Sequence, residues 1–303
     1  MDQLMRAFYD HRFETYFRSK RGKDFQDLFA DIMAHRYGTS FHRVCPWGQQ
    51  GDWKCDGYLK SEEMLFACYA PREMKDTKTA RKIDEDFSGA VAQWKKYMQK
   101  WVFVHNDPEG LSPRVTQKLL ELGRRCPDID VRHWGIIEVK SKCLELQQSD
   151  LEEILGKAPD KKAMMNTGME ELVPVLKTIE DMPPEGQQDL SQPSADKIEH
   201  NMISESVRSL LKAGMTKAPL VRRYFQSNSS PEKRDSIAKA FKRRYQEFRN
   251  ANLPPDEIFA KLHEHVGGEA QSAPKRLCAE FAVLSHFFET CDIFENAPSE
   301  DGE

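Results

Sequence analysis

The segment from Pro46 to Pro71 constrains the fold more than any other part of this chain. It begins with a glycine-rich turn and continues into a short predicted strand that carries Asp56 near its end. A tight polar turn follows, and the apolar residues from Met64 to Ala70 predict a second, buried strand. Two short strands joined by so tight a turn predict a β-hairpin.

Three charged residues alternate along the first predicted strand. Residues two apart on an extended strand face the same way, so Asp52, Lys54 and Asp56 are expected to share one face. Two carboxylates beside an ammonium group can hold a divalent cation and orient a water or stabilise an oxyanion. An ordinary hairpin with a solvated outer face would show the same spacing. Spacing alone leaves both interpretations open.

The composition narrows the class of protein. A length of 303 residues suits two domains. A net charge of −4 and a pI near 6.2 argue against a generally nucleic-acid-binding surface, although local basic patches remain compatible. The seven cysteines form no Cys-x-x-Cys pair, which indicates neither a disulfide framework nor a zinc ribbon. Since no apolar run has the length of a membrane helix, we expect a cytoplasmic protein.

Around the hairpin the periodicity alternates between helix and strand. Helical spacing predicts helices over residues 13–37, 83–101 and 113–122. The first of these is expected to be interrupted near Arg21 and to end at Gly38. Short apolar runs predict strands at 101–104 and 129–135. This alternation predicts an α/β sandwich, which we assign to residues 1–178.

The C-terminal part has a different pattern. A polar, proline-containing linker is predicted at 179–195, a helical assembly domain at 196–296, and a disordered tail at 297–303. The last helix carries more apolar surface than a small domain easily buries, so oligomerisation or docking onto a partner is expected. The residues that suggest this are Phe281, Phe287, Phe288, Ile293 and Phe294.

The N-terminal part resembles the PD-(D/E)XK, restriction-endonuclease-like superfamily, nearest its Mrr-type branch. The segment 25–29 resembles the first helix of that branch, and 51–57 resembles its Gly-Asp-x-Gly-x-Asp-Gly strand. The resemblance implies an α/β/α sandwich that binds Mg²⁺ or Mn²⁺ through Asp56, with help from Asp52 or Asp27. It covers roughly residues 13 to 140.

The sequence departs from that family pattern at two positions. The second strand of the family normally carries Glu or Gln followed two residues later by Lys, and this chain has Ala67 and Tyr69 there. We expect Lys54, on the same predicted face as Asp56, to take over the role of the missing lysine. Alternatively, the site has lost catalysis and the domain only binds DNA or another subunit.

The C-terminal segment 283–295 resembles the terminal helix of effectors in bacterial ABC-three-component systems, the group that includes Lamassu-type antiphage defence. This resemblance implies an SMC-like ABC ATPase and a small middle subunit as partners. It also implies an effector that is inhibited until foreign DNA is detected.

Two functions therefore follow from the sequence. In the first, the chain is a metal-dependent endonuclease of double-stranded DNA, active as a homo-oligomer, with Asp56, Lys54 and Asp52 as catalytic residues. In the second, the same domain is a non-enzymatic DNA- or subunit-binding module. The direction in which the Lys54 side chain points discriminates between them.

Overall fold

The computed structural model describes residues 1–46, 53–180, 201, 203–228, 231–267, 272–290 and 293–294. The chain forms two compact units. The sheet unit comprises Phe13–Ile154, and the C-terminal unit combines Met1–Arg12 with Leu155–Glu303. The predicted tail at 297–303 and the predicted linker beyond residue 180 lie outside the described residues.

A mixed five-stranded sheet organises the sheet unit. Its strands lie side by side in chain order, with β1–β2 and β2–β3 antiparallel and β3–β4 and β4–β5 parallel. The strands are β1 (Phe41–Arg43), β2 (Gly57–Leu59), β3 (Met64–Tyr69), β4 (Lys100–His105) and β5 (Asp130–Trp134).

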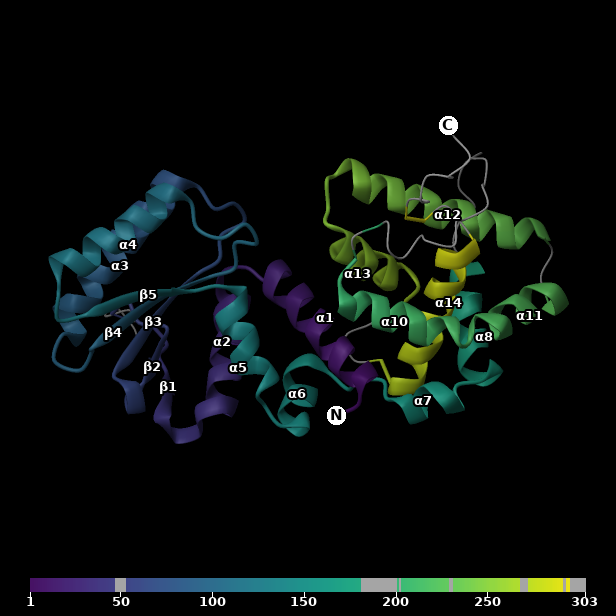
Figure 1. The fold of residues 1–303 in the computed structure, drawn as a ribbon, viewed down its shortest axis with the longest axis horizontal. Coiled ribbons are helices and arrows are strands. Elements are labelled where there is room, and N and C mark those ends of the chain that lie inside the picture. Colours follow the sequence, from purple (N-terminus) through teal and green to yellow (C-terminus); the bar gives the residue numbers. More distant parts are fainter. Residues whose placement is uncertain are drawn as a thin grey trace, which may run out of the picture. The chain divides into compact units, whose positions relative to one another are not determined.

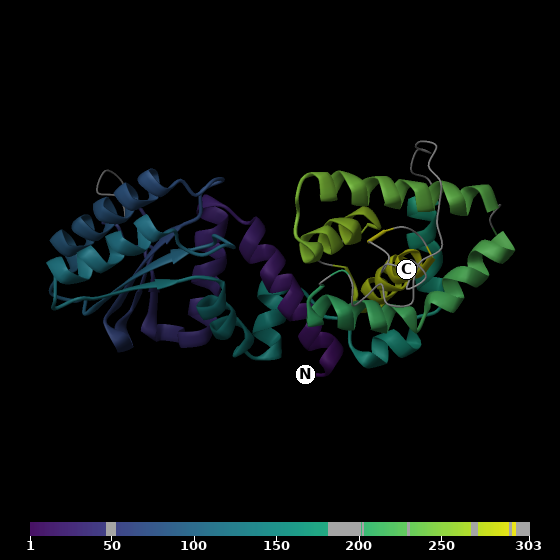
Figure 2. The same ribbon diagram turned by 45° about the horizontal axis from the view of Figure 1, so that its top comes forward.

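Helices cover both faces of this sheet (Figure 1). One face carries α2 (Gly22–Tyr37), which packs against α5 (Ile136–Leu144), and the other carries the packed pair α3 (Asp76–Trp94) and α4 (Pro113–Arg125). Figure 2 shows the same layering from a second direction. The prediction of a mixed α/β architecture is confirmed.

Strand β3 is buried on both faces, which explains its continuous apolar sequence. Phe66 points toward α2, where its ring centre lies 5.1 Å from that of Phe29. Leu65 and Ala67 alternate to the other face and join the core beneath α3 and α4. The residues that follow Ala67 therefore reach the end of β3 between two helical layers.

The predicted elements exist, but several bounds differ. The helix predicted over 83–101 is α3, which already ends at Trp94, so that β4 begins at Lys100. The predicted helix 13–37 consists of α2 and part of α1 (Gln3–Ser19), with the break near Arg21 where it was expected. Gly38 follows α2 as its C-cap, as predicted.

The described residues of the C-terminal unit beyond α1 form helices and connecting loops. These helices are α7 (Lys161–Asn166), α8 (Met169–Glu180), α10 (Glu205–Met215), α11 (Ala218–Asn228), α12 (Pro231–Asn250), α13 (Pro255–His265) and α14 (Pro274–Thr290). The preceding helix α6 (Gln148–Leu155) belongs to the sheet unit except for its last residue.

Helix α14 is the centre of this unit, and it contacts α7, α8, α10, α11 and α13. In both views it lies among the other helices (Figures 1 and 2). All five apolar residues that suggested an excess of exposed surface are buried, each at 3% exposure or less. The expectation of more apolar surface than this domain easily buries is therefore wrong. Helix α14 is buried on all sides from Leu277 to Phe288, and Ile293 and Phe294, which follow the helix, are buried as well.

Among the described residues, no helix combines the length and the apolar character that a membrane crossing requires.

Candidate active site at the end of strand β3

The strand predicted to carry Asp52, Lys54 and Asp56 is not formed by these residues, because β2 begins only at Gly57. Trp53 and Lys54 have φ angles of 52° and 62°, in the left-handed region, and belong to a turn. A residue with positive φ cannot continue an extended strand. The predicted single-face ladder of Asp52, Lys54 and Asp56 is therefore wrong at Lys54, and Asp52 lies outside the described residues.

Asp56 connects this turn to the end of β3. Its backbone N–H donates to the carbonyl of Phe66 at 2.9 Å, and its Oδ2 accepts from the N–H of Cys68 at 2.6 Å. The carboxylate thus takes the place of a strand carbonyl where β2 has not yet begun. Burial, followed by the charge of Asp56, raises the pKa of the Cys68 thiol well above its usual value, so Cys68 is a neutral, packed residue.

Lys54 points toward helix α3. Its Nζ lies 3.2 Å from Oδ1 of Asp86, a carboxylate whose side chain is only 5% exposed. A Cβ atom added at Gly89, one turn further along α3, would lie 2.6 Å from Cγ of Lys54. The missing side chain at Gly89 therefore makes room for the stem of Lys54.

A second ammonium group shares the same carboxylate. Nζ of Lys82 lies 2.6 Å from Oδ1 of Asp86 and 2.5 Å from its Oδ2. One buried negative charge is thus held by two partly exposed lysines, so that Asp86, Lys54 and Lys82 together carry one net positive charge. Such an arrangement suits an anionic ligand such as a phosphate.

Asp86 was not identified from the sequence. The available signal was its position on the buried stripe of α3, which includes Ile83, Phe87 and Ala90. A carboxylate on an apolar helix face needs a charged or hydrogen-bonding partner, and that requirement marks it as a candidate.

The two family positions that lack catalytic side chains take part in packing. Ala67 is buried in the core beneath α3. The ring centre of Tyr69 lies 6.2 Å from that of Phe103, and burial, with a smaller effect of the charge of Asp86, raises the pKa of Tyr69. Asp56 and Asp86 thus act on the successive residues Cys68 and Tyr69 at the end of β3.

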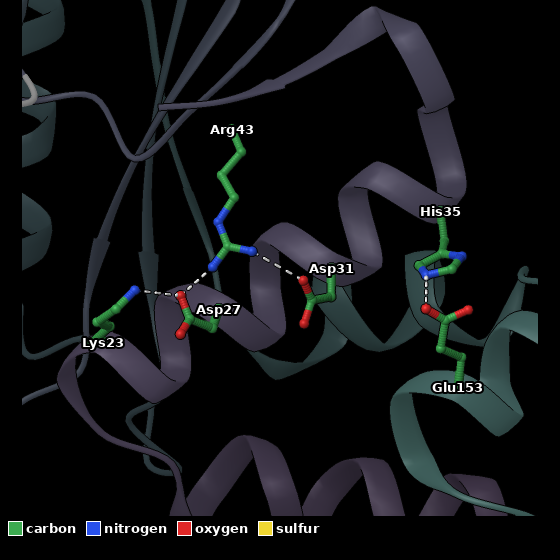
Figure 3. A network of polar contacts seen from close by, with 6 residues as sticks. All are labelled: Lys23, Asp27, Asp31, His35, Arg43 and Glu153. Atoms are coloured by element: carbon green, nitrogen blue, oxygen red, sulfur yellow. Dashed lines mark hydrogen bonds and ion pairs between the residues drawn. The ribbon is translucent and has the colours of Figure 1, made fainter. Parts of the chain in front are cut away.

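Asp27, the other predicted metal ligand, takes part in a different network on α2 (Figure 3). Its Oδ1 lies 3.0 Å from Nζ of Lys23 and also accepts a hydrogen bond from Arg43, which in turn contacts Asp31 at 3.1 Å. Burial raises the pKa of Asp27, but Lys23 and Arg43 outweigh this effect and lower it overall. Asp27 is therefore an ionised, paired surface carboxylate.

The described residues contain no group of three or more His, Cys, Asp or Glu side chains arranged to hold a metal ion. Mg²⁺ is commonly bound by one or two carboxylates together with substrate phosphates and water. Asp56 offers the right donor type for that mode of binding, with one carboxylate oxygen accepting from Cys68.

The comparisons with known proteins concern the C-terminal unit. Residues 170–295 match the family model of C-terminal domain 10 of the ABC-three component (ABC-3C) systems. This match supports membership of the chain in an ABC-3C system. No curated protein and no solved structure matches the chain.

Proposed function

We propose that this chain is the effector subunit of an ABC-three-component antiphage system and that its sheet unit is a divalent-metal-dependent DNA endonuclease. The match of residues 170–295 supports the system. The observation that carries the nuclease proposal is the ion pair between Lys54 and the buried Asp86, next to the Asp56 hairpin. It brings acidic and basic side chains to one end of β3.

The order of elements also supports this proposal. A helix, three consecutive antiparallel strands, a helix and a parallel strand follow one another from α2 to β4. This order is compatible with the α/β/α sandwich that the resemblance to restriction-endonuclease-like proteins implies. The resemblance itself rests on the motifs in the sequence.

Each residue of the site has a distinct proposed role. Asp56, with Asp52, would hold Mg²⁺ or Mn²⁺, and the bound metal would polarise the scissile phosphate. Lys54 would stabilise the negative charge that develops on that phosphate. Asp86 contacts Lys54 rather than substrate, so we assign it a positioning role. In this proposal double-stranded DNA is the substrate.

The proposed partners are an SMC-like ABC ATPase and a small middle subunit, which would keep the effector inactive until foreign DNA is detected. Homo-oligomerisation of the active form is part of the same proposal, and it would bring two sites onto opposite DNA strands. The buried aromatic residues of α14 do not contribute to that interface.

A second candidate function is a DNA- or subunit-binding module without catalysis. The packing of Ala67 and Tyr69 favours it, because these positions carry no metal ligand and no ammonium group. If this alternative is correct, Lys54 and Lys82 serve only to bind phosphates.

Plasmid cleavage by the purified chain, alone and with its co-encoded subunits, tests the proposal. We expect nicking or cutting in Mg²⁺ or Mn²⁺ and none in EDTA. Asp56→Asn should reduce the rate at least about a hundredfold, in the range seen when one charge-stabilising group is removed. The asparagine oxygen can still accept from Cys68, so the hairpin should remain folded.

Glu85→Gln, on the same helix as Asp86 but paired with Arg81 at the surface, is the matched control and should cut normally. Equal cutting by Asp56→Asn and the parent chain would remove Asp56 from the mechanism. Absence of cutting with every combination of subunits, while DNA binding persists, would establish the binding module instead.

A further inference from the structure

Exposed aromatic side chains are concentrated at one place in the described part of the chain. Only two of its Phe, Tyr and Trp side chains are exposed, Trp53 at 46% and Tyr97 at 61%. Both lie beside Trp94, the last residue of α3. Aromatic surface is costly to leave in water, so two such residues at one place indicate a binding surface.

Trp94 and Tyr58 join these residues into one cluster. The ring of Trp53 meets that of Trp94 edge-on at a centroid distance of 6.3 Å, and Tyr58 stacks on the same indole at 5.7 Å. The hydroxyl of Tyr58 donates to the carbonyl of Tyr97 at 2.6 Å. We call the four residues Trp53, Tyr58, Trp94 and Tyr97 the aromatic platform.

Two residues of the platform, Trp53 and Tyr58, are held in place by the structure around them. Trp53 lies in the left-handed turn, and the next residue, Lys54, is fixed by its ion pair with Asp86. Tyr58 belongs to β2 and is half-buried against the core under α3. A surface aromatic residue fixed in this way loses little conformational entropy when a ligand stacks on it.

The charge around the platform is mainly positive. Lys95 and Lys96 follow Trp94, are exposed, and form no ion pair with another described residue. The charge of Glu63 acts on the platform, where it adds to burial in raising the pKa of Tyr58. Glu62 is already paired with Lys100 at 2.9 Å. The platform is therefore flanked by two ammonium groups available to phosphates.

We propose that the aromatic platform stacks on an unpaired base of a nucleic-acid strand while Lys95 and Lys96 contact its phosphates. Base–aromatic stacking is tolerant of sequence, because every base presents a π-face. The platform adjoins Lys54, so the bound strand would pass the proposed cleavage site. The inference deepens the proposed function by adding an unpaired strand to its substrate class, but the stacking itself requires no cleavage.

Fluorescence anisotropy with labelled oligothymidine, oligouridine and a blunt DNA duplex tests this proposal. The titrations are done on the full chain in EDTA, so that no cutting interferes. We expect single strands to bind more tightly than the duplex, and Trp53→Ala and Tyr97→Ala each to weaken single-strand binding about tenfold or more. The comparison of thymidine with uridine oligomers separates DNA from RNA.

Two controls separate stacking from other effects. Trp53→Phe keeps a ring and should retain most of the affinity, whereas Leu120→Ala, at an exposed apolar residue of α4, should bind like the parent chain. A Lys95→Ala/Lys96→Ala double variant should reduce the salt dependence of binding, because fewer counterions are released.

Unchanged binding of oligonucleotides by Trp53→Ala would overturn the proposal, and so would equal affinity for the duplex. If Trp53→Ala instead disrupts assembly with the co-encoded subunits, the platform is a protein interface and the proposal fails. Asp56→Asn should keep the single-strand affinity, so loss of cutting and loss of stacking are measured separately.

Discussion

The position of the Lys54 ammonium group depends on backbone conformation and on one missing side chain. The left-handed φ of 62° at Lys54 directs its side chain away from the strand direction and toward α3. Gly89 then leaves space for the lysine stem next to the helix. A non-glycine residue held at positive φ stores about 1–3 kcal/mol of strain, and such residues cluster at functional sites.

Gly89→Ala is expected to separate stability from activity. Alanine favours the helix over glycine by about 1 kcal/mol, yet its Cβ would lie 2.6 Å from Cγ of Lys54. We expect an unchanged or higher melting temperature together with a fall in DNA cleavage of about tenfold or more.

Gly123→Ala in α4 is the matched control, because its Cβ would lie 4.0 Å from Val131, an ordinary contact. It should raise stability without changing cleavage. If Gly89→Ala cuts DNA as fast as the parent chain, the position of Lys54 does not matter for activity.

Three buried histidines are expected to make the free energy of unfolding depend on pH. Burial lowers the pKa of His105 and His286 to about 4 and that of His11 to about 3. The positive charges of Arg234 and Arg222 lower the pKa of His286 further. Neither ring nitrogen of His286 has a hydrogen-bond partner among the described residues.

These shifts predict acid destabilisation between about pH 6.5 and pH 4. In that window the histidines become protonated in the unfolded chain but stay neutral in the folded chain, so the free energy of unfolding falls as the pH falls. The free energy of unfolding changes by up to about 1.4 kcal/mol per pH unit for each histidine. Urea unfolding at pH 7 and pH 5 measures it.

His286→Phe should keep the stacking on Phe225 and reduce the loss of stability between these two pH values by about 1–2 kcal/mol. A substitution at the exposed His42, such as His42→Asn, should leave the pH dependence unchanged. An identical pH profile for His286→Phe would show that the pKa of His286 is the same in the folded and the unfolded chain.

At the scale of elements, the close approach of α10 to α14 holds the C-terminal unit together. Gly214 of α10 lies so near α14 that an added Cβ would fall 2.3 Å from the carbonyl oxygen of Phe281 and from Oγ of Ser285. The Ser285 hydroxyl donates to the carbonyl of Leu211 at 3.0 Å, which ties the two helices at the same level. Glycine is needed here for space and not for its backbone freedom.

Gly214→Ala is therefore expected to destabilise the C-terminal unit by about 1–3 kcal/mol, as overpacking of a tight core does. Its better helix propensity cannot compensate for a contact with backbone atoms, which cannot move aside. Thermal unfolding monitored by circular dichroism measures the effect.

Lys212→Ala, at an exposed position of the same helix, should change stability by less than about 0.5 kcal/mol. An unchanged melting temperature for Gly214→Ala would mean that α10 and α14 are further apart than the structure places them.

At the scale of the whole molecule, α1 contributes to both units. Its first residues belong to the C-terminal unit, where Asp10 contacts Ser206 and the ring of His11 lies 5.2 Å from that of Phe259. Its second half belongs to the sheet unit, where Phe17 meets Phe25 at 5.1 Å. The family match begins at residue 170, so it omits an N-terminal part of this unit.

Two substitutions in this one helix should therefore affect different units. Phe8→Ala should cost about 3–5 kcal/mol and accelerate hydrogen exchange in α10, α13 and α14. Phe17→Ala should cost a similar free energy of unfolding, but it should accelerate hydrogen exchange in β3 and β4. Each variant is the control for the other, and equal effects on both units would show that the chain unfolds as one body.

The sequence by itself determined the layered α/β order, the hairpin, the break near Arg21 and the helical character of the C-terminal part. These features follow from local periodicity and turn residues, which act over a few positions. It also placed Asp56 in the hairpin, but near the end of the first predicted strand, whereas in the structure Asp56 directly precedes β2.

The tertiary structure alone decided which side chains meet. The ion pair of Lys54 with Asp86 joins residues 32 positions apart, and neither the turn conformation at Trp53 nor the space at Gly89 is visible as a periodic pattern. The burial of α14 on all sides likewise depends on helices from distant parts of the chain. Local sequence fixes the direction of each element, whereas charge pairing and packing are set by neighbours that only folding brings together.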